Sequence, residues 1–170
     1  MPRRFVIEAV MMTIYGQLLS PSNTVQYYIP YSTIMELYEM KDHPEQVMPD
    51  PADDAHVKQK IAELIAYFED SFNKKKLERA LASVWRESPP LPINDLVSLI
   101  VVNAIDNAEY GDAVDPVETE LILTSMRTQA PILTDQFEFM DKVIDGSIPV
   151  QMFDIEDFEY ALEADHPQFF

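Results

Sequence analysis

The chain has 170 residues, of which 47% are hydrophobic and 25% charged, the proportions of one ordinary globular domain. The absence of cysteine excludes disulfides and thiolate metal sites, and the three glycines form no repeated-glycine phosphate loop. The net charge of −18 is uneven, because residues 1–86 carry 12 acids and 10 bases whereas residues 87–170 carry 18 acids and two bases; such acidity repels nucleic acid and anionic lipid, and it also favours solubility.

The N-terminal stretch combines a basic pair with an apolar run and so invites comparison with a targeting segment. Arg3 and Arg4 precede the apolar residues 5–15, but Glu8 interrupts that run and no small-residue cleavage pattern follows it. No apolar run reaches the roughly 18–20 residues that a membrane helix needs. We therefore expect a cytoplasmic protein with no membrane partner.

The first quarter of the chain predicts two strands. Large apolar and β-branched residues favour a buried strand over 5–12, which runs into a helix near 15–19. Residues 25–29 predict a second strand, ended by Pro30.

Helices are predicted on both sides of an irregular connection. Ser32 is a candidate cap for a short helix over 33–40. Prolines and acids indicate an irregular, solvated connection over about 41–56. Beyond it, apolar residues recur at helical spacing, namely Val57, Ile61, Leu64, Ile65 and Phe68. In the helix that follows, the residues predicted to face inward are Leu77, Leu81 and Val84.

Residues 94–111 predict a buried helix, with Asn94 or Asp95 as its cap and Gly111 at its end. Its apolar residues are Leu96, Leu99, Ile100, Ile105 and Ala108. The elements predicted after it are a helix over 116–129, a strand over 131–134, a helix over 136–144, a strand over 148–153 and a helix over 155–162. This alternation predicts one α/β domain over residues 1–170, with helices in two layers around a mostly parallel sheet.

Functional groups in parallel α/β folds gather at the carboxyl ends of strands. Glu8 lies in the first predicted strand, and Asp135 follows the strand over 131–134. Asp115 and Glu118 open the helix at 116, and Glu36 belongs to the helix after the second strand. If these acids converge, mutual repulsion raises the pKa of at least one of them in the absence of metal.

This order of acids resembles the PIN-domain family of metal-dependent nucleases. The resemblance rests on Phe-Val-Ile-Glu (5–8), on Ile-Pro-Tyr-Ser-Thr-Ile-Met-Glu-Leu (29–37) and on Ile-Leu-Thr-Asp (132–135). A helix opened by Asp115 or Glu118 precedes the last of these motifs by about 20 residues. The motifs are short, but together they span most of the chain.

The resemblance implies an α/β/α sandwich in which carboxylates hold Mg²⁺ or Mn²⁺ and the metal promotes hydrolysis of single-stranded RNA. Such hard cations prefer carboxylate and water oxygens. Carried over, the metal ligands would be Glu8, Glu36 and Asp135, with Asp115 or Glu118 as the fourth, and Asp135 and Glu8 would be the catalytic acids.

Each acid also has a structural interpretation. Glu8 can belong to an amphipathic helix, and Glu36 can be a solvated helix acid. Asp115 and Glu118 have the spacing of a capping box around Pro116, and Asp135 can cap the following helix.

The one basic stretch is a candidate nucleic-acid contact, formed by Lys74, Lys75, Lys76 and Arg79. A solvated helix face explains the same residues. The alternative function is a non-catalytic α/β protein whose acidic face, within residues 154–165, binds a basic protein partner. Nine methionines and the terminal pair Phe169-Phe170 are compatible with a homodimer.

Overall fold

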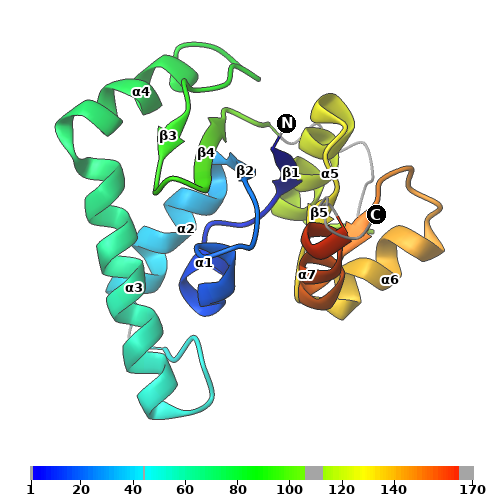
Figure 1. The fold of residues 1–170 in the computed structure, drawn as a ribbon, viewed down its shortest axis with the longest axis horizontal. Helices are drawn as coiled ribbons and strands as arrows, with labels where there is room; N and C mark the ends of the chain where they lie inside the picture. Colours follow the sequence, from blue (N-terminus) through cyan, green and yellow to red (C-terminus); the bar gives the residue numbers. More distant parts are fainter. Residues whose placement is uncertain (1, 44, 106–112, 165–170) are drawn as a thin grey trace.

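The computed structural model describes residues 2–43, 45–105 and 113–164 and contains a six-stranded sheet of order β3-β4-β2-β1-β5-β6 (Figure 1). The strands are β1 (Arg3–Val6), β2 (Val25–Pro30), β3 (Leu91–Pro92), β4 (Val97–Val102), β5 (Ile132–Leu133) and β6 (Met152–Phe153). Every neighbouring pair is parallel except β3, which runs antiparallel to β4. The predicted α/β class with a mostly parallel sheet is confirmed.

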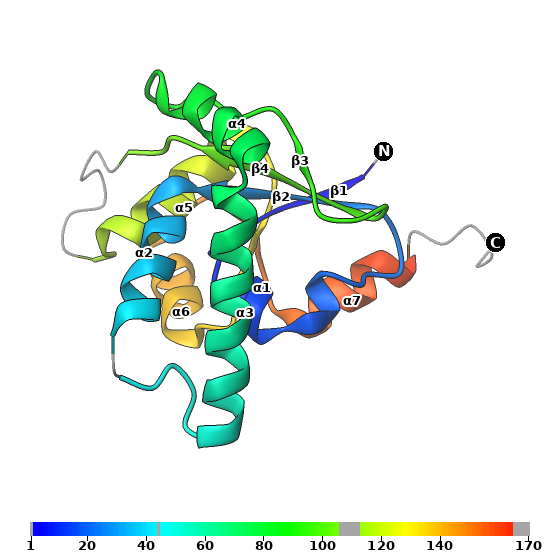
Figure 2. The ribbon, with the colours of Figure 1, turned by 90° about the vertical axis from the view of Figure 1, so that its left-hand side faces the viewer.

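Seven α-helices and one short 3-10 helix lie around the sheet in the described ranges, and Figure 2 shows the seven α-helices from a second direction. They are α1 (Met11–Ile14), η1 (Gly16–Leu18), α2 (Tyr31–Asp42), α3 (Pro51–Glu69), α4 (Ser71–Leu81), α5 (Pro116–Thr128), α6 (Phe137–Asp145) and α7 (Ile155–Ala164). Among the described residues, no helix has both the length and the apolar character that crossing a bilayer requires.

Two hydrophobic clusters cover the two faces of the sheet. Side chains alternate between faces along a strand, and Phe5 and Ile7 accordingly belong to one cluster while Val6 belongs to the other. The first cluster also takes residues from α1, α2, α3, α4 and α7, and the second takes residues from α5 and α6. This arrangement is the expected three-layer α/β/α sandwich.

The prediction of a helix over residues 94–111 is wrong for the residues that the structure describes, because Val97–Val102 form strand β4. This run is rich in β-branched residues and pairs with β2 on one side and β3 on the other. A short apolar run buried on both faces has no periodicity that distinguishes a strand from a helix. Leu96 and Ile105 are 40% and 42% exposed and stay outside the core. Ala108 and Gly111 lie outside the described residues.

Several element limits also differ from the prediction. β1 ends at Val6, so Glu8 follows the strand, and β6 contains only Met152 and Phe153 of the predicted strand. Ser32 does not cap α2, whose N-cap position is Pro30. Leu77 is buried as predicted, whereas Leu81 and Val84, at the end of α4 and beyond it, are exposed.

The irregular connection between α2 and α3 is shorter than the predicted range of 41–56. α3 begins at Pro51 because the Asp50 side chain accepts hydrogen bonds from the amides of Ala52 and Asp53. The buried Asp54 carboxylate then accepts from the amides of Val47 and Met48, at 2.6 and 3.1 Å. These bonds fold the connection back onto the helix.

Candidate functional site

The candidate site lies where the carboxyl ends of the central strands meet. β1 lies between β2 and β5 in the sheet (Figure 1). The segment after β1 leads into α1 on one face of the sheet, whereas the segment after β5 leads into α6 on the other. Glu8 comes two residues after β1, and Asp135 two residues after β5. α2 follows β2 without a break and carries Glu36. A switch point of this kind is where open α/β sheets bind their ligands.

Glu8 is half-buried in a turn that leads into α1. Burial, followed by the charges of Glu36, Asp135, Asp115 and Glu118, raises the pKa of Glu8 from 4.5 to about 7. Each of the other four acids predicted from the sequence therefore lies near enough to Glu8 to affect its pKa. The amphipathic-helix interpretation of Glu8 is wrong, since the residue precedes α1.

Thr33 ties the Glu8 turn to the start of α2. The amide of Ala9 donates a hydrogen bond of 3.1 Å to Thr33 Oγ1, and that hydroxyl donates one of 2.9 Å to the carbonyl of Pro30. Thr33 is buried, so both bonds are shielded from water. They fix the backbone that carries Glu8 relative to the helix that carries Glu36.

Glu36 is half-buried, and its Oε1 atom is buried without a hydrogen-bond partner. Burial first, and then the charges of Glu39, Asp115 and Glu120, raise the pKa of this carboxyl. A buried carboxylate oxygen without a donor is costly unless a proton or cation satisfies it. The interpretation of Glu36 as a fully solvated helix acid is therefore wrong.

Asp135 is half-buried and oriented by a residue that sequence reasoning missed. The Tyr15 hydroxyl donates a 2.8 Å hydrogen bond to Asp135 Oδ2. Burial and this hydrogen bond raise the pKa of Tyr15 to about 12. Asp135 does not cap α6, because the N-cap position is Gln136 and no side-chain cap is present. Its carboxylate is thus available to the site.

Asp115 and Glu118 form the predicted capping box of α5. Asp115 Oδ1 accepts from the Glu118 amide at 2.7 Å, and Glu118 Oε1 accepts from the Asp115 amide at 3.0 Å. The same Oε1 atom lies 3.0 Å from Lys142 Nζ on α6, in an ion pair that raises the pKa of Lys142. Glu118 is thus buried and compensated, whereas Asp115 is exposed and keeps one oxygen outside the box.

A second pair missed as site residues joins α2 to α5. The Ser32 hydroxyl donates a hydrogen bond to Glu120 Oε2, and Glu120 is one of the charges that raise the pKa of Glu36. Only the spacing of residues in the sequence could have indicated that Ser32 and Glu120 belong to the site. Ser32 lies four residues before Glu36, one turn earlier on the same helix face, and Glu120 lies two residues after Glu118.

The donor set fits a hard divalent cation by chemistry, because it consists of carboxylates and includes the partnerless oxygen of Glu36. In the described ranges, however, no three acidic or histidine side chains are arranged to hold one ion together. For several of these acids to bind one ion together, their side chains would therefore have to move. The carboxylate oxygens that accept no hydrogen bond, such as Glu36 Oε1, are the ones that could then bind the ion.

The predicted nucleic-acid residues lie away from this set of contacts. Lys74, Lys75, Lys76 and Arg79 belong to α4, which packs on α3 and β4. Lys76 donates to the carbonyl of Pro90 at 2.8 Å and lies over the Phe72 ring, while the other three are exposed. Among the hydrogen bonds, ion pairs and ring contacts of the described residues, none joins them to Glu8, Glu36 or Asp135, so their role stays a prediction.

No protein-family model matches this chain, and no curated protein matches it.

Proposed function

We propose that the protein is a divergent PIN-like hydrolase that cleaves RNA phosphodiester bonds with Mg²⁺ or Mn²⁺. The observation that supports this proposal is the raised pKa of Glu8, which responds to acids from three other parts of the fold at a switch point of the sheet. Natural folds rarely gather uncompensated acids in one place without a functional reason.

In this proposal, Glu8, Glu36, Asp135 and Asp115 hold the metal. We assign the fourth place to Asp115, because Glu118 is already compensated by Lys142. The bound metal supplies Lewis-acid activation of water and of the phosphate oxygens. Tyr15 orients Asp135, and Thr33 orients the turn that carries Glu8. Lys142 lowers the negative charge that the phosphate backbone meets at the start of α5.

Cleavage of a fluorescently labelled single-stranded RNA with Mn²⁺, with Mg²⁺ and with EDTA tests the proposal. We expect metal-dependent cleavage that Asp135→Asn and Glu36→Gln each reduce by at least about tenfold, since each loses a charged ligand. Asp141→Asn, an exposed acid on α6, is the matched control and should cleave like the wild type. Absence of cleavage with either metal, or equal cleavage by Asp135→Asn, would overturn the proposal.

The acidic surface of α7 favours a second candidate function, a binding site for a basic protein. Glu156, Asp157, Glu159 and Glu163 are exposed, and Tyr160 beside them is 74% exposed. A basic partner would be steered to such a surface. We expect salt-sensitive capture of that partner, lost when Glu156, Glu159 and Glu163 are changed to Lys. Capture that is unchanged by this reversal would refute the second candidate.

A further inference from the structure

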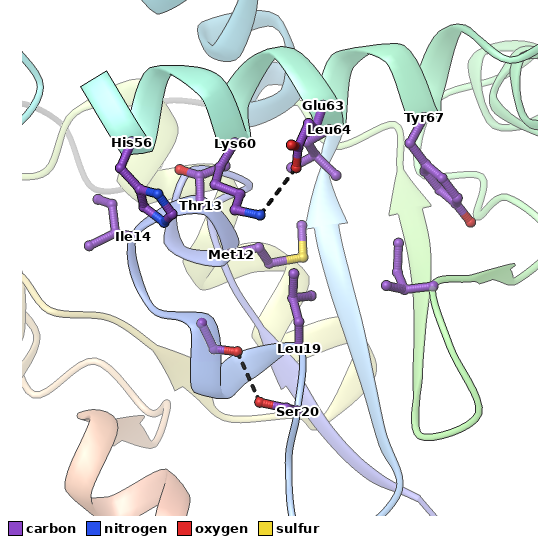
Figure 3. A pocket seen from close by; sticks show the side chains of 12 residues that line it. Met12, Thr13, Ile14, Leu19, Ser20, His56, Lys60, Glu63, Leu64 and Tyr67 are labelled. Carbon is purple, nitrogen blue, oxygen red and sulfur yellow. Dashed lines mark hydrogen bonds and ion pairs between the residues drawn. The ribbon is translucent and has the colours of Figure 1, made fainter. Parts of the chain in front are cut away.

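A groove of about 440 Å³ lies between the α1–η1 segment and α3 (Figure 3). Its floor and walls are apolar, formed by Met12, Leu19, Leu64 and Ile93. None of the proposed metal ligands lines this groove. It is therefore a separate feature of the fold, and its volume falls within the range of about 300–1,000 Å³ that small-ligand pockets occupy.

Tyr67 forms a fixed wall at one end of the groove. Its hydroxyl donates a 2.6 Å hydrogen bond to the carbonyl of Pro92, next to Ile93. The bond satisfies the polar end of the side chain and holds the ring in place. What Tyr67 offers a ligand is thus an aromatic surface.

Lys60, at the rim of the groove, can exchange its ion pair with Glu63 for one with a ligand. Figure 3 shows His56, Lys60 and Glu63 projecting from α3 above Met12. Lys60 Nζ lies 3.3 Å from Glu63 Oε2, and the two side chains are 44% and 54% exposed. An ion pair this exposed contributes little to stability, so a ligand carboxylate can replace Glu63 at low cost.

Gly16 lines the groove and has open space where a side chain would begin. A Cβ built at Gly16 meets no heavy atom within 4 Å, and the backbone there does not adopt the left-handed conformation that requires glycine. Position 16 can therefore carry a side chain without backbone strain, which provides a direct way to fill the groove.

We propose that this groove binds a small amphipathic carboxylate, with a medium-length alkyl chain or an aromatic ring as its apolar part. The apolar part lies on Met12 and Leu64, where its burial supplies affinity. The carboxylate accepts hydrogen bonds from Lys60 Nζ and from the His56 ring at the rim. A cationic ligand meets one acid at this rim, Glu63, with Lys60 beside it, whereas a carboxylate meets both Lys60 and His56.

Titration with octanoate, octanol and octylamine tests the proposal, with calorimetry for affinity and methyl NMR shifts of Met12, Ile14 and Leu64 for location. We expect saturable octanoate binding, weaker octanol binding and no octylamine binding. Lys60→Met should weaken octanoate about tenfold and leave octanol unchanged, because only the carboxylate loses a charged donor. Lys74→Met on α4 is the matched control.

Two further variants separate occupancy from folding. Gly16→Phe should abolish octanoate binding and keep the wild-type circular dichroism spectrum, whereas Gly16→Ala should still bind. If Gly16→Phe fails to fold, Leu64→Gln at a half-buried position should weaken octanoate and octanol alike. Absence of saturable octanoate binding, octylamine binding as tight as octanoate, or octanoate binding that survives filling of the groove would each overturn the proposal.

Discussion

At the level of single residues, the pKa of Glu8 reflects both burial and the negative charge gathered at the edge of the sheet. Its pKa is raised from 4.5 to about 7, first by burial and then by Glu36, Asp135 and neighbouring acids. The folded state therefore binds the Glu8 proton more tightly than the unfolded state does. The resulting stabilisation is fully present below about pH 4.5 and is lost as the pH rises through about 7.

Glu8→Gln removes this pH dependence, because the amide resembles the protonated carboxyl and does not ionise. Between pH 4.5 and pH 8 in EDTA, we expect the unfolding free energy of the wild type to fall by about 3 kcal/mol more than that of Glu8→Gln. Urea unfolding at several pH values measures the difference. Parallel curves for the two proteins would show that Glu8 is not perturbed by its neighbours.

The hydroxyl of Tyr15 is the second residue whose role can be isolated. Tyr15→Phe removes the 2.8 Å hydrogen bond to Asp135 and keeps the ring. We expect a loss of about 1 kcal/mol in unfolding free energy and weaker Mn²⁺ binding, since Asp135 is no longer oriented. Tyr38→Phe is the control, because its hydroxyl bonds an exposed acid, Glu69, away from the site. Equal Mn²⁺ affinity in Tyr15→Phe and wild type would contradict the orienting role.

At the scale of elements, the start of α5 combines capping with the proposed metal binding, and two substitutions of Asp115 separate these roles. Asparagine is as good an N-cap as aspartate but carries no charge. Asp115→Asn should keep wild-type stability and lose Mn²⁺ affinity, whereas Asp115→Ala should also lose about 1 kcal/mol of unfolding free energy. Urea unfolding and Mn²⁺ titration of both variants decide. Wild-type Mn²⁺ affinity in Asp115→Asn would remove Asp115 from the site.

Elements with local signals could be predicted from the sequence. α5 has Asp115, Pro116 and Glu118 at its start, and β2 is a β-branched and aromatic run ended by a proline. β4 was mispredicted, because its pairing with β2 and β3 is non-local and its short apolar run shows no period, although its β-branched residues favour a strand. The error there came from tertiary pairing overriding a pattern too short to show a period.

The acids of the candidate site could be predicted from the sequence, but the residues that contact and orient these acids could not. Acids that follow strands of a parallel sheet are brought to one edge by topology alone, and this applies to Glu8 and Asp135. Tyr15 and Lys142 reach the site through side-chain orientation, which the spacing of residues does not encode. The pKa values of Glu8 and Glu36 are raised, but burial is the first cause and the charges of neighbouring acids, which were expected to cause the rise, come second.

At the scale of the whole molecule, the net charge of −18 opposes the compact state. Salt screens this repulsion, since the screening length falls to about 8 Å at physiological ionic strength. We expect the melting temperature to rise with NaCl concentration at pH 8, with most of the rise at low salt. A melting temperature that falls over the same NaCl range would show that ion pairs outweigh the repulsion.

Thermal melting with Mn²⁺ examines whether the acids at the sheet edge bind a divalent cation. Wild type, Asp135→Asn and Asp141→Asn are melted with Mn²⁺ and, at matched ionic strength, with NaCl alone. A ligand at about 100 times its dissociation constant stabilises by about 2.7 kcal/mol, which raises the melting temperature of a domain this size by several degrees. We expect that rise for wild type and Asp141→Asn and its loss in Asp135→Asn. Equal melting of all three proteins in both salts would contradict it.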